Sequence, residues 1–317
     1  MTEKSEIKFL EVDENRQGQR IDNFLITHLK GVPKSLIYRI LRKGEVRVNK
    51  KRVKPDYRLN QADMIRIPPL RLGQATNKDE AAKPSESLQE LLIQRVLYED
   101  NGLLIINKPA GIAVHGGSGI SLGLIEALRA MRPQEKFLEL VHRLDRDTSG
   151  CLIFAKKASV LRELHELLRN NQIEKIYLAL VKGYWPKYIR MVDAPLLKNE
   201  LQSGERVVKV SAQGKQALTE FRIMQRFDEA TLVEAKLLTG RTHQIRVHAA
   251  HSEHPIIGDE KYGDKEFNKQ MRKHGCRRLF LHACRLSFTL PSTQQTIMVS
   301  AQLEKSLQDC LDKLNKE

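Results

Sequence analysis

Residues 70–89 interrupt the apolar patterning that runs through the rest of this 317-residue chain. They are rich in Ala, Ser, Lys, Asp and Gln, a composition typical of flexible linkers and domain boundaries. Because such a segment cannot contribute to a core, the chain is expected to fold as separate domains on either side of it. We predict an N-terminal tail over 1–17, a small domain over 18–69, a linker over 70–93 and a larger domain over 94–317.

Positive charge is concentrated in the small domain. The chain has 54 Lys and Arg residues against 39 Asp and Glu, a net charge of +15. Between Lys30 and Lys54, ten basic residues accompany a single acid, Glu45, which leaves nine of the fifteen net charges in this segment. A cluster of this kind indicates a polyanionic partner. A solvated basic face without a partner is the alternative.

Apolar spacing predicts how the small domain presents these charges. Helices are expected over 20–29 and 35–43, the second ended by Gly44, and short strands over 46–49, 52–54 and 64–68. The runs Arg20-Ile-Asp-Asn-Phe-Leu25, Arg42-Lys-Gly44 and Val46-Arg-Val-Asn49 resemble an S4 RNA-binding domain. The resemblance implies attachment to structured RNA through its phosphates. The expected RNA contacts in this domain are Lys34, Arg39, Arg42, Lys43, Arg47, Lys50, Lys51 and Arg52.

Strand patterns dominate the larger domain. Helices are expected over 122–132 and 160–170, and strands over 96–99, 103–107, 151–156, 176–182, 207–211, 219–224, 232–237 and 279–289. The strands are paired by turns, and no regular βαβ rhythm connects them. This order predicts an α+β domain with a mixed, largely antiparallel sheet.

Several classes of protein lack support in the sequence. No P-loop is present and no GxGxxG follows a strand, so a nucleotide cofactor is not expected. No apolar run approaches the roughly 18 residues of a membrane span, and residues 1–16 contain no hydrophobic signal core. We therefore expect a cytoplasmic protein that has neither a cofactor nor a membrane partner.

The cysteines and histidines offer one candidate metal site. His274-Gly-Cys276 and His282-Ala-Cys284 could together supply four soft zinc ligands. Because these residues surround a strand, where packing usually explains them, we predict no metal site. The absence of a CxxC pair or a disulfide-framework spacing predicts ordinary reduced thiols for Cys151, Cys276, Cys284 and Cys310.

The first segment with candidate chemistry is Val141-His-Arg-Leu-Asp-Arg-Asp-Thr-Ser-Gly150, which ends where an apolar strand begins. Asp145 lies between Arg143 and Arg146, and nearby cations favour the ionised carboxylate. Such a carboxylate could act as a nucleophile or stabilise developing positive charge. The alternative is a charged loop whose short polar side chains only satisfy backbone donors.

The second segment is Thr239-Gly-Arg-Thr-His-Gln-Ile-Arg-Val-His248. With Thr242 as the N-cap, His243 and Arg246 would lie on one face of a helix, beside Arg241 at its start. Helix N-termini and arginines attract anions, either a phosphate or a catalytic carboxylate. A solvated Arg/His face is the alternative for this helix.

Together these segments are similar to the RluA-type family of RNA pseudouridine synthases, over residues 96–290. The resemblance implies the pseudouridine synthase fold and an enzyme that isomerises uridine to pseudouridine in RNA without a cofactor or metal. Beside the S4 resemblance, the runs Val32-Pro-Lys-Ser35, Lys108-Pro-Ala-Gly-Ile-Ala-Val-His-Gly-Gly-Ser-Gly119 and Phe137-Leu-Glu-Leu-Val-His-Arg-Leu-Asp145 imply 23S ribosomal RNA, naked or in a large-subunit assembly intermediate, as substrate and partner. We expect the chain to act as a monomer.

The same resemblance implies roles for individual residues. It makes Asp145 the catalytic aspartate and Arg246 the arginine that pairs with its carboxylate. It makes Arg143 the side chain that replaces the extruded uridine in the RNA stack, and Tyr177 the tyrosine that packs against the target base. Without the family, Tyr177 would be a strand tyrosine half in the core. Two further expected RNA contacts are His115 and Arg241.

Two other functions are compatible with these residues. One is an S4-bearing ribosome-binding or assembly factor with an inactive catalytic fold, against which the presence of Asp145, Tyr177 and Arg246 argues. The other is a nucleoside or glycoside hydrolase that uses Asp145 with Asp147. Carboxylates two residues apart are poorly placed to flank a bond from opposite faces. For a synthase, three routes are open to Asp145: attack at C1′, addition at C6, or removal of a sugar proton.

Overall fold

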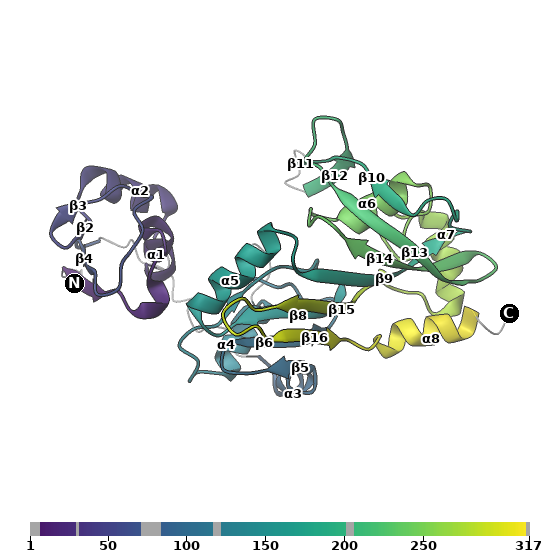
Figure 1. The fold of residues 1–317 in the computed structure, drawn as a ribbon, viewed down its shortest axis with the longest axis horizontal. Helices are drawn as coiled ribbons and strands as arrows, with labels where there is room; N and C mark the ends of the chain where they lie inside the picture. The colour runs from purple at the N-terminus through teal and green to yellow at the C-terminus, as the bar shows by residue number, and fades with distance from the viewer. Residues whose placement is uncertain (1–6, 30–31, 71–83, 117–121, 201–205, 315–317) are drawn as a thin grey trace, which may run out of the picture. The chain divides into compact units, whose positions relative to one another are not determined.

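The computed structural model describes residues 7–29, 32–70, 84–116, 122–200 and 206–314. The chain divides into two compact units (Figure 1). The first unit comprises residues 1–83 with the short segment 157–159, and the second comprises residues 84–156 and 160–317. Within the described ranges, none of the helices combines the length and apolar character that crossing a membrane requires.

The first unit packs two helices on a small antiparallel sheet. The sheet has the order β1-β4-β2-β3, and the helices are α1 (Ile21–His28) and α2 (Lys34–Lys43), preceded by the short 3₁₀ helix η1 (Glu14–Arg16). Both helices bury their apolar faces in one core, which Val48 and Ile65 complete from the sheet. Gly44 ends α2 in the left-handed conformation, with φ at 70°, which favours glycine. The strands are β1 (Lys8–Glu11), β2 (Arg47–Val48), β3 (Lys51–Arg52) and β4 (Met64–Ile67).

The structure corrects both ends of the predicted small domain. Part of the predicted tail over 1–17 is strand β1, which pairs with β4 from Lys8 and Ile67 to Glu11 and Met64. Part of the predicted linker over 70–93 is helix α3 (Glu86–Gln94), in which Leu92 is buried. Strand β1 is too short to show an apolar period, whereas Leu88, Leu91 and Leu92 of α3 have helical spacing behind the N-cap Ser85, a pattern that the linker prediction did not use. The rest of the predicted linker, over 71–83, lies outside the described residues.

The second unit is built on a ten-stranded mixed sheet. Eight strands follow the order β10-β13-β14-β9-β15-β8-β6-β5, while β16 pairs with β15 and β7 pairs with β8. The pairing of β8 with β15 is parallel and the other pairings are antiparallel, which confirms the predicted α+β class. The strands are β5 (Val96–Glu99), β6 (Leu103–Lys108), β7 (Glu139–Leu140), β8 (Ser149–Ala155), β9 (Glu174–Lys182), β10 (Met191–Asp193), β13 (Leu218–Arg226), β14 (Ala230–Leu237), β15 (Leu281–Thr289) and β16 (Thr296–Ser300).

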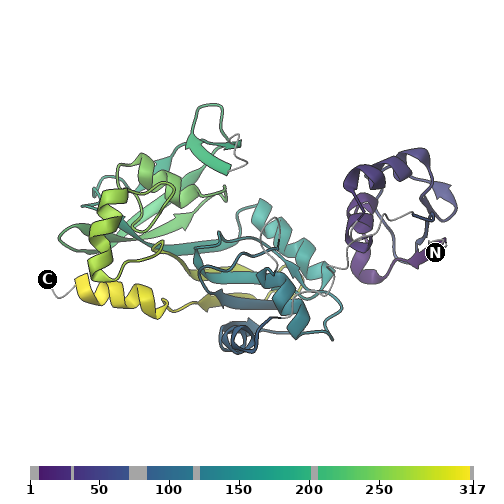
Figure 2. The same ribbon diagram turned by 180° about the vertical axis from the view of Figure 1, so that it is seen from behind.

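Helices accompany both halves of this sheet. Figures 1 and 2 show α3, α4 and α5 in the half that contains β5, β6 and β8, and α6, α7 and α8 in the half that contains β13 and β14. A separate two-stranded sheet pairs β11 (Leu196–Glu200) with β12 (Arg206–Val210). The helices are α4 (Leu124–Met131), α5 (Ala158–Arg169), α6 (Gln244–His251), α7 (Lys265–Met271) and α8 (Lys305–Leu314), with a 3₁₀ turn η2 (Arg272–His274) after α7.

Gly150 permits the parallel contact at the centre of the sheet. Its φ is 111°, and a Cβ added there would overlap the backbone of Ala283 in β15. Gly150 and Ala283 are register partners in the pairing of β8 with β15. A glycine is therefore required where the segment that carries Asp145 enters the sheet.

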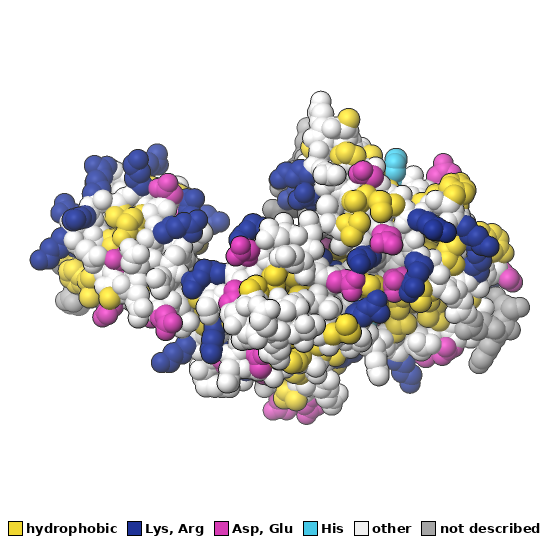
Figure 3. All heavy atoms as spheres, in the orientation of Figure 1, with side chains coloured by type: hydrophobic (Ala, Val, Ile, Leu, Met, Phe, Trp, Pro, Cys, Tyr) yellow, Lys and Arg dark blue, Asp and Glu magenta, His cyan; other side chains and the backbone are white. Residues whose placement is uncertain are grey.

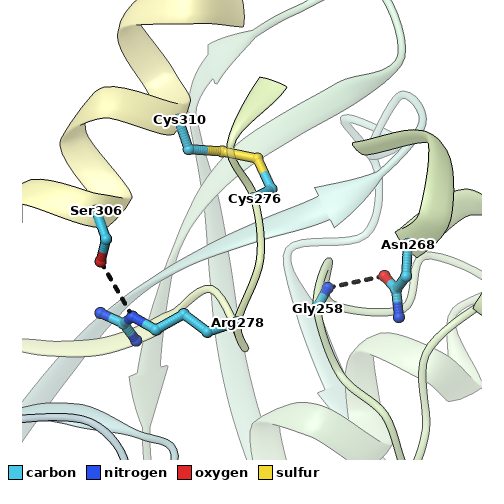
Figure 4. Close-up of a disulfide and its surroundings, with 6 residues drawn as sticks. All are labelled: Gly258, Asn268, Cys276, Arg278, Ser306 and Cys310. Carbon is cyan, nitrogen blue, oxygen red and sulfur yellow. Dashed lines mark hydrogen bonds between the residues drawn. A yellow bond between two sulfur atoms is a disulfide. The ribbon is translucent and has the colours of Figure 1, made fainter. Parts of the chain in front are cut away.

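The structure also corrects the prediction that all four cysteines are reduced thiols. A disulfide joins Cys276, which follows η2, to Cys310 in α8, with the two Cα atoms 5.3 Å apart (Figure 4). The same close-up shows Arg278 and Ser306 hydrogen bonded at 3.4 Å between the same two segments. The two cysteines are 34 residues apart, and their spacing does not reveal that folding brings them together. Cys151 and Cys284 are free thiols.

Candidate active site

A cavity of about 550 Å³ opens in the second unit. Its walls come from the segment between β7 and β8, from β9, from the end of β14, and from the loop that leads into α6. The sequence predicted five functional residues in three separate segments of this domain, and the structure places them together in this cavity. They are Arg143, Asp145, Tyr177, Arg241 and Arg246.

Lys108 fixes the backbone beside Asp145. It is fully buried, and its Nζ donates hydrogen bonds to the carbonyl oxygens of Pro109 at 2.8 Å, Ile112 at 2.9 Å and Arg146 at 2.9 Å. Burial lowers the pKa of Lys108 to about 8. The three acceptors match the three protons of an ammonium group, so the loop around Asp145 is held to the end of β6.

Arg246 joins two carboxylates. Its NH1 donates to Oδ2 of Asp145 at 3.1 Å, while its Nε and NH2 donate to the two carboxylate oxygens of Asp259 at 2.7 and 2.8 Å. Burial opposes the charge of Arg246, but the hydrogen bonds to Asp259 and Asp145 outweigh it and raise its pKa. Burial also disfavours the charged form of Asp259, yet the bonds from Arg246 lower its pKa overall. The bidentate contact with Asp259 therefore orients the guanidinium toward Asp145.

His243 is a neutral neighbour of Asp145. Burial lowers the pKa of His243, and its Nε2 lies 3.6 Å from Oδ2 of Asp145, beyond hydrogen-bond distance. Its Nδ1 is 2.8 Å from the hydroxyl of Tyr262, and that hydroxyl accepts the backbone N–H of Val208 at 3.0 Å. The contact with Tyr262 therefore holds the imidazole beside Asp145.

The start of α6 differs from the prediction that Thr242 is its N-cap. The N-cap is His243, in a left-handed conformation with φ at 53°, and it makes no side-chain capping bond. The contact of the imidazole with Tyr262 accompanies this unusual backbone. His243 therefore turns away from the regular helix, while Arg246 lies in the first turn.

The cavity has one aromatic wall and one unused hydroxyl. Tyr177 lies in β9, is 7% exposed, and has a pKa that burial raises. Oγ1 of Thr148 is buried and has no hydrogen-bond partner among the described residues. Arg143 is exposed where it lines the cavity. The cavity beside Asp145 therefore has space for a ligand, and these side chains offer it an aromatic surface and polar groups.

The cation that contacts Asp145 is distant in the sequence. Arg146, one of the two expected flanking cations, instead donates from Nε to Asp147 at 3.2 Å. Arg246 lies 101 residues from Asp145 and reaches its carboxylate directly. The cation that is hydrogen bonded to Asp145 is thus Arg246 of α6, which the resemblance had implied, and not the neighbouring Arg146.

Three residues of the site were missed by the sequence analysis. Asp259, Tyr262 and Lys108 contact the candidate catalytic groups or their backbone, and none stands out by periodicity or charge clustering. The local signal for Asp259 is weak: an acid directly after an apolar pair and a glycine, in Ile256-Ile-Gly-Asp259.

The residues considered for zinc are engaged in other contacts. The sulfur of Cys276 is bonded to Cys310. The ring nitrogens of His282 lie 2.9 Å from Oγ of Ser149 and 3.1 Å from the carbonyl of Ala301. Among the described residues, no three His, Cys, Asp or Glu side chains lie together in a way that could hold a metal ion.

The side chains that were predicted to contact RNA are exposed. His115 is exposed and does not line the cavity, whereas Nε of Arg241 donates to the carbonyl of Gln216 at 3.0 Å. Lys30 lies outside the described residues. Figure 3 shows Lys and Arg side chains over the visible face of the first unit. The eight predicted contacts of this unit are all exposed, and within the described chain they form no ion pair with an acid: Lys34, Arg39, Arg42, Lys43, Arg47, Lys50, Lys51 and Arg52.

Comparison with known families places both units. Residues 102–251 match the model of the RNA pseudouridylate synthase family, and residues 19–65 match the model of the S4 domain. Among solved structures, human RNA pseudouridylate synthase domain containing 4 superposes with a TM-score of 0.60 at 26% identity. That match covers 72% of this chain and 96% of the human one. Human RNA pseudouridylate synthase domain containing 1 gives a TM-score of 0.56, also at 26% identity, over 68% and 86% of the two chains.

Curated relatives match over nearly the whole chain. Ribosomal large subunit pseudouridine synthase C of Escherichia coli K12 is 55% identical over 99% of this chain and 98% of its own length. The protein of the same name from Haemophilus influenzae is 55% identical over 98% of this chain and 96% of its own. The chain therefore belongs to the RNA pseudouridylate synthase family and carries an S4 domain ahead of its synthase domain.

Proposed function

We propose that this chain converts uridines of 23S ribosomal RNA to pseudouridine, with Asp145 as the catalytic carboxylate. The observation that carries the proposal is the contact between Asp145 and Arg246 in a cavity that Tyr177 also lines. The names of its relatives support the large ribosomal subunit as the source of the substrate. We further propose that the chain works in the cytoplasm and as a monomer.

The reaction is an isomerisation within one nucleotide. The N1–C1′ bond of uridine breaks, the uracil turns without leaving, and C5 joins C1′ and loses its proton while N1 gains one. The uridine must first leave its helix, which costs a few kcal/mol of unstacking. A cavity of about 550 Å³ is in the ordinary range for a site that encloses a small molecule.

The residues around the cavity divide this work. Arg143, exposed at the cavity, can fill the space that the uridine vacates, and Tyr177 can pack against the flipped base. Arg246 holds Asp145 in position through the hydrogen bond from NH1 while the sugar becomes electron-deficient. Asp259 acts on the reaction through Arg246, because its carboxylate is bound to that guanidinium, and its Oδ1 also accepts the backbone N–H groups of Lys261 and Tyr262.

Mapping pseudouridines across 23S rRNA tests the proposal. RNA from cells that lack this protein should miss pseudouridine at the sites that the protein modifies, and expression of the intact chain should restore them. Expression of Asp145→Asn should not restore them. A complete set of pseudouridines in cells without the protein would contradict the proposal.

The exposed cations of the first unit should strengthen RNA binding without recognising a sequence. Replacing Lys34, Lys50 and Lys51 by glutamine should weaken binding and reduce the salt dependence of the affinity by about one log-log unit for each phosphate that is no longer neutralised. Titration of the intact chain with an rRNA fragment at several salt concentrations measures both effects. The same replacement of the exposed Lys265, Lys269 and Lys273 is the matched control, and an equal effect there would refute a special role for the first unit.

A further inference from the structure

Lys175 is a mostly buried residue that brings an ammonium group to the cavity without an internal counter-charge. The residue is 8% exposed and lines the cavity. In the part of the chain that the structure describes, no hydrogen bond or ion pair engages its Nζ, and burial is the only cause of its lowered pKa. The adjacent acid, Glu174, is paired with Lys236 at 2.7 Å. Burying a charge without a partner is unfavourable, so a ligand that brings negative charge would complete this site.

The surroundings of Lys175 locate its charge within the cavity. Lys175 and Tyr177 are two apart in β9, so they lie on the same face of the strand at a separation of about 7 Å. A Cβ added at Gly240 would be 3.8 Å from Nζ, which places the ammonium beside the loop that leads into α6. His142, which also lines the cavity, is neutral because burial and then the charge of Lys175 lower its pKa to about 3.

We propose that Lys175 stabilises the negative charge that develops on uracil while the base is detached from and rejoined to the sugar. This inference rests on the proposed function. It gives Lys175 a role different from that of Asp145: the ammonium contacts the base and stabilises its negative charge, whereas the carboxylate reacts with the sugar or the base. The negative charge of bound RNA favours the protonated ammonium that this role requires.

The electron balance of the reaction explains why a cation is needed there. When the N1–C1′ bond breaks, its electron pair stays on the uracil, and the charge spreads from N1 onto the carbonyl oxygens O2 and O4. If Asp145 adds to C6 instead, the electrons displaced from the C5–C6 bond reach O4 as an enolate. Each route therefore places extra negative charge on the base before C5 bonds to C1′ and loses its proton. A cation fixed beside that charge lowers the barrier because it binds the transition state more strongly than neutral uridine.

Burial favours the base over a phosphate as the group that Lys175 contacts. A phosphate is part of the RNA backbone, which is too bulky to enter a buried site. Phosphates are therefore usually contacted by exposed cations, such as those of the first unit. Lys175 instead lies on the buried face that it shares with Tyr177, the residue proposed to pack against the flipped base. A flat pyrimidine against the Tyr177 ring would bring one edge within reach of the ammonium.

Lys175→Met separates this role from a structural one. Methionine keeps the length and apolar stem of the side chain and removes the buried charge, so the variant should fold at least as stably as the parent. Under single-turnover conditions with saturating enzyme, release of tritium from C5-tritiated uridine in rRNA should fall by about 100-fold. The dissociation constant for RNA should change by less than about threefold, since the variant removes a single cation and leaves the exposed ones in place. Lys182→Met, in the same strand but paired with Asp264 outside the cavity, is the matched control and should retain its rate.

A fluorinated base tests whether the missing charge acts on uracil. Fluorine at C5 withdraws electrons and stabilises the uracil anion by itself, so breakage of the N1–C1′ bond in RNA with 5-fluorouridine needs less help. The deficit of Lys175→Met should therefore shrink from about 100-fold with uridine to below about tenfold with 5-fluorouridine. Chromatography of the digested RNA measures the loss of N1-linked 5-fluorouridine.

Three results would overturn the inference. An equal deficit with both bases would indicate that Lys175 acts on structure. An unchanged single-turnover rate with weaker RNA binding and a smaller salt dependence would make Lys175 a phosphate contact. Absence of tritium release by the parent chain on any large-subunit rRNA would refute the proposed function itself, and this inference with it.

Discussion

Replacing Asp145 by asparagine should lower pseudouridine formation by about 10⁴-fold or more, the loss typical of removing a nucleophile or essential carboxylate. Asparagine has the same shape but is a poor nucleophile and a poor base. It can still accept the hydrogen bond that Arg246 donates through NH1. The measurement is tritium release from C5-tritiated uridine in rRNA, in parallel with the RNA dissociation constant. Binding should stay within about threefold of the parent, because neutralising a carboxylate leaves the cations that bind phosphate unchanged.

The matched control is Asp147→Asn, two residues along the same loop. Asp147 is half exposed and pairs with Arg146 at 3.2 Å, an exposed contact that contributes little to stability. Retained activity in this variant would separate Asp145 from its acidic neighbour. Loss of activity in Asp147→Asn together with free uracil among the products would favour the hydrolase that uses both carboxylates. Unchanged modification by Asp145→Asn would show that another group performs the chemistry.

Replacing Arg246 by methionine should reduce both stability and activity. The change leaves the carboxylate of Asp259, with a side chain 1% exposed, buried without its bidentate partner. Breaking a buried ion pair in this way typically costs about 3–5 kcal/mol of unfolding free energy. Loss of the guanidinium at Asp145 should also lower the rate by at least about 100-fold. Denaturant unfolding and single-turnover tritium release measure the two effects.

A double variant separates the structural from the catalytic part of that loss. In Arg246→Met with Asp259→Leu, no buried charge is left without a partner, so most of the missing stability should return. The rate should remain low, because the double variant still lacks the cation that contacts Asp145. Recovery of the rate along with stability would show that Arg246 serves only to hold the fold. The sequence suggested a role for Arg246 in the chemistry alone. The structure indicates that Arg246 also stabilises the fold, through its ion pair with Asp259.

Local patterns were sufficient to predict most of the two domains. The helical spacing before Gly44 and the strand patterns from Val96 onward predict elements that the structure contains within a few residues. Helix and strand periods depend on which neighbours along the chain are apolar. Both periods can therefore be recognised in a short stretch of sequence. Strand β1 shows the limit of such patterns. Its four residues are predicted as part of a tail, because their pairing with β4 depends on a segment more than fifty residues away.

The site around Asp145 also contains residues that the sequence predicted and residues that only the structure identifies. Its resemblance to RluA-type synthases pointed to Asp145, Arg143, Tyr177 and Arg246, and the structure places all four at one cavity. The roles of these residues remain predictions that the variants above test. The supporting contacts of Lys108, Tyr262 and Asp259 were not predicted, since each depends on a partner supplied by another segment.

The sequence by itself determined the class of the protein: a basic domain, an α+β domain, and a carboxylate in a motif specific enough to indicate its family. The resemblance named Arg246 as the partner of that carboxylate, but only the tertiary structure showed that Asp259 orients this arginine and that Lys175 lines the same cavity. Arg246 reaches Asp145 across 101 residues, and Lys175 faces the cavity without an acid to neutralise it. The physical reason is that charge pairing and burial depend on distances in space. Those distances are set when β8, β9 and α6 pack together, and no local period along the chain records them.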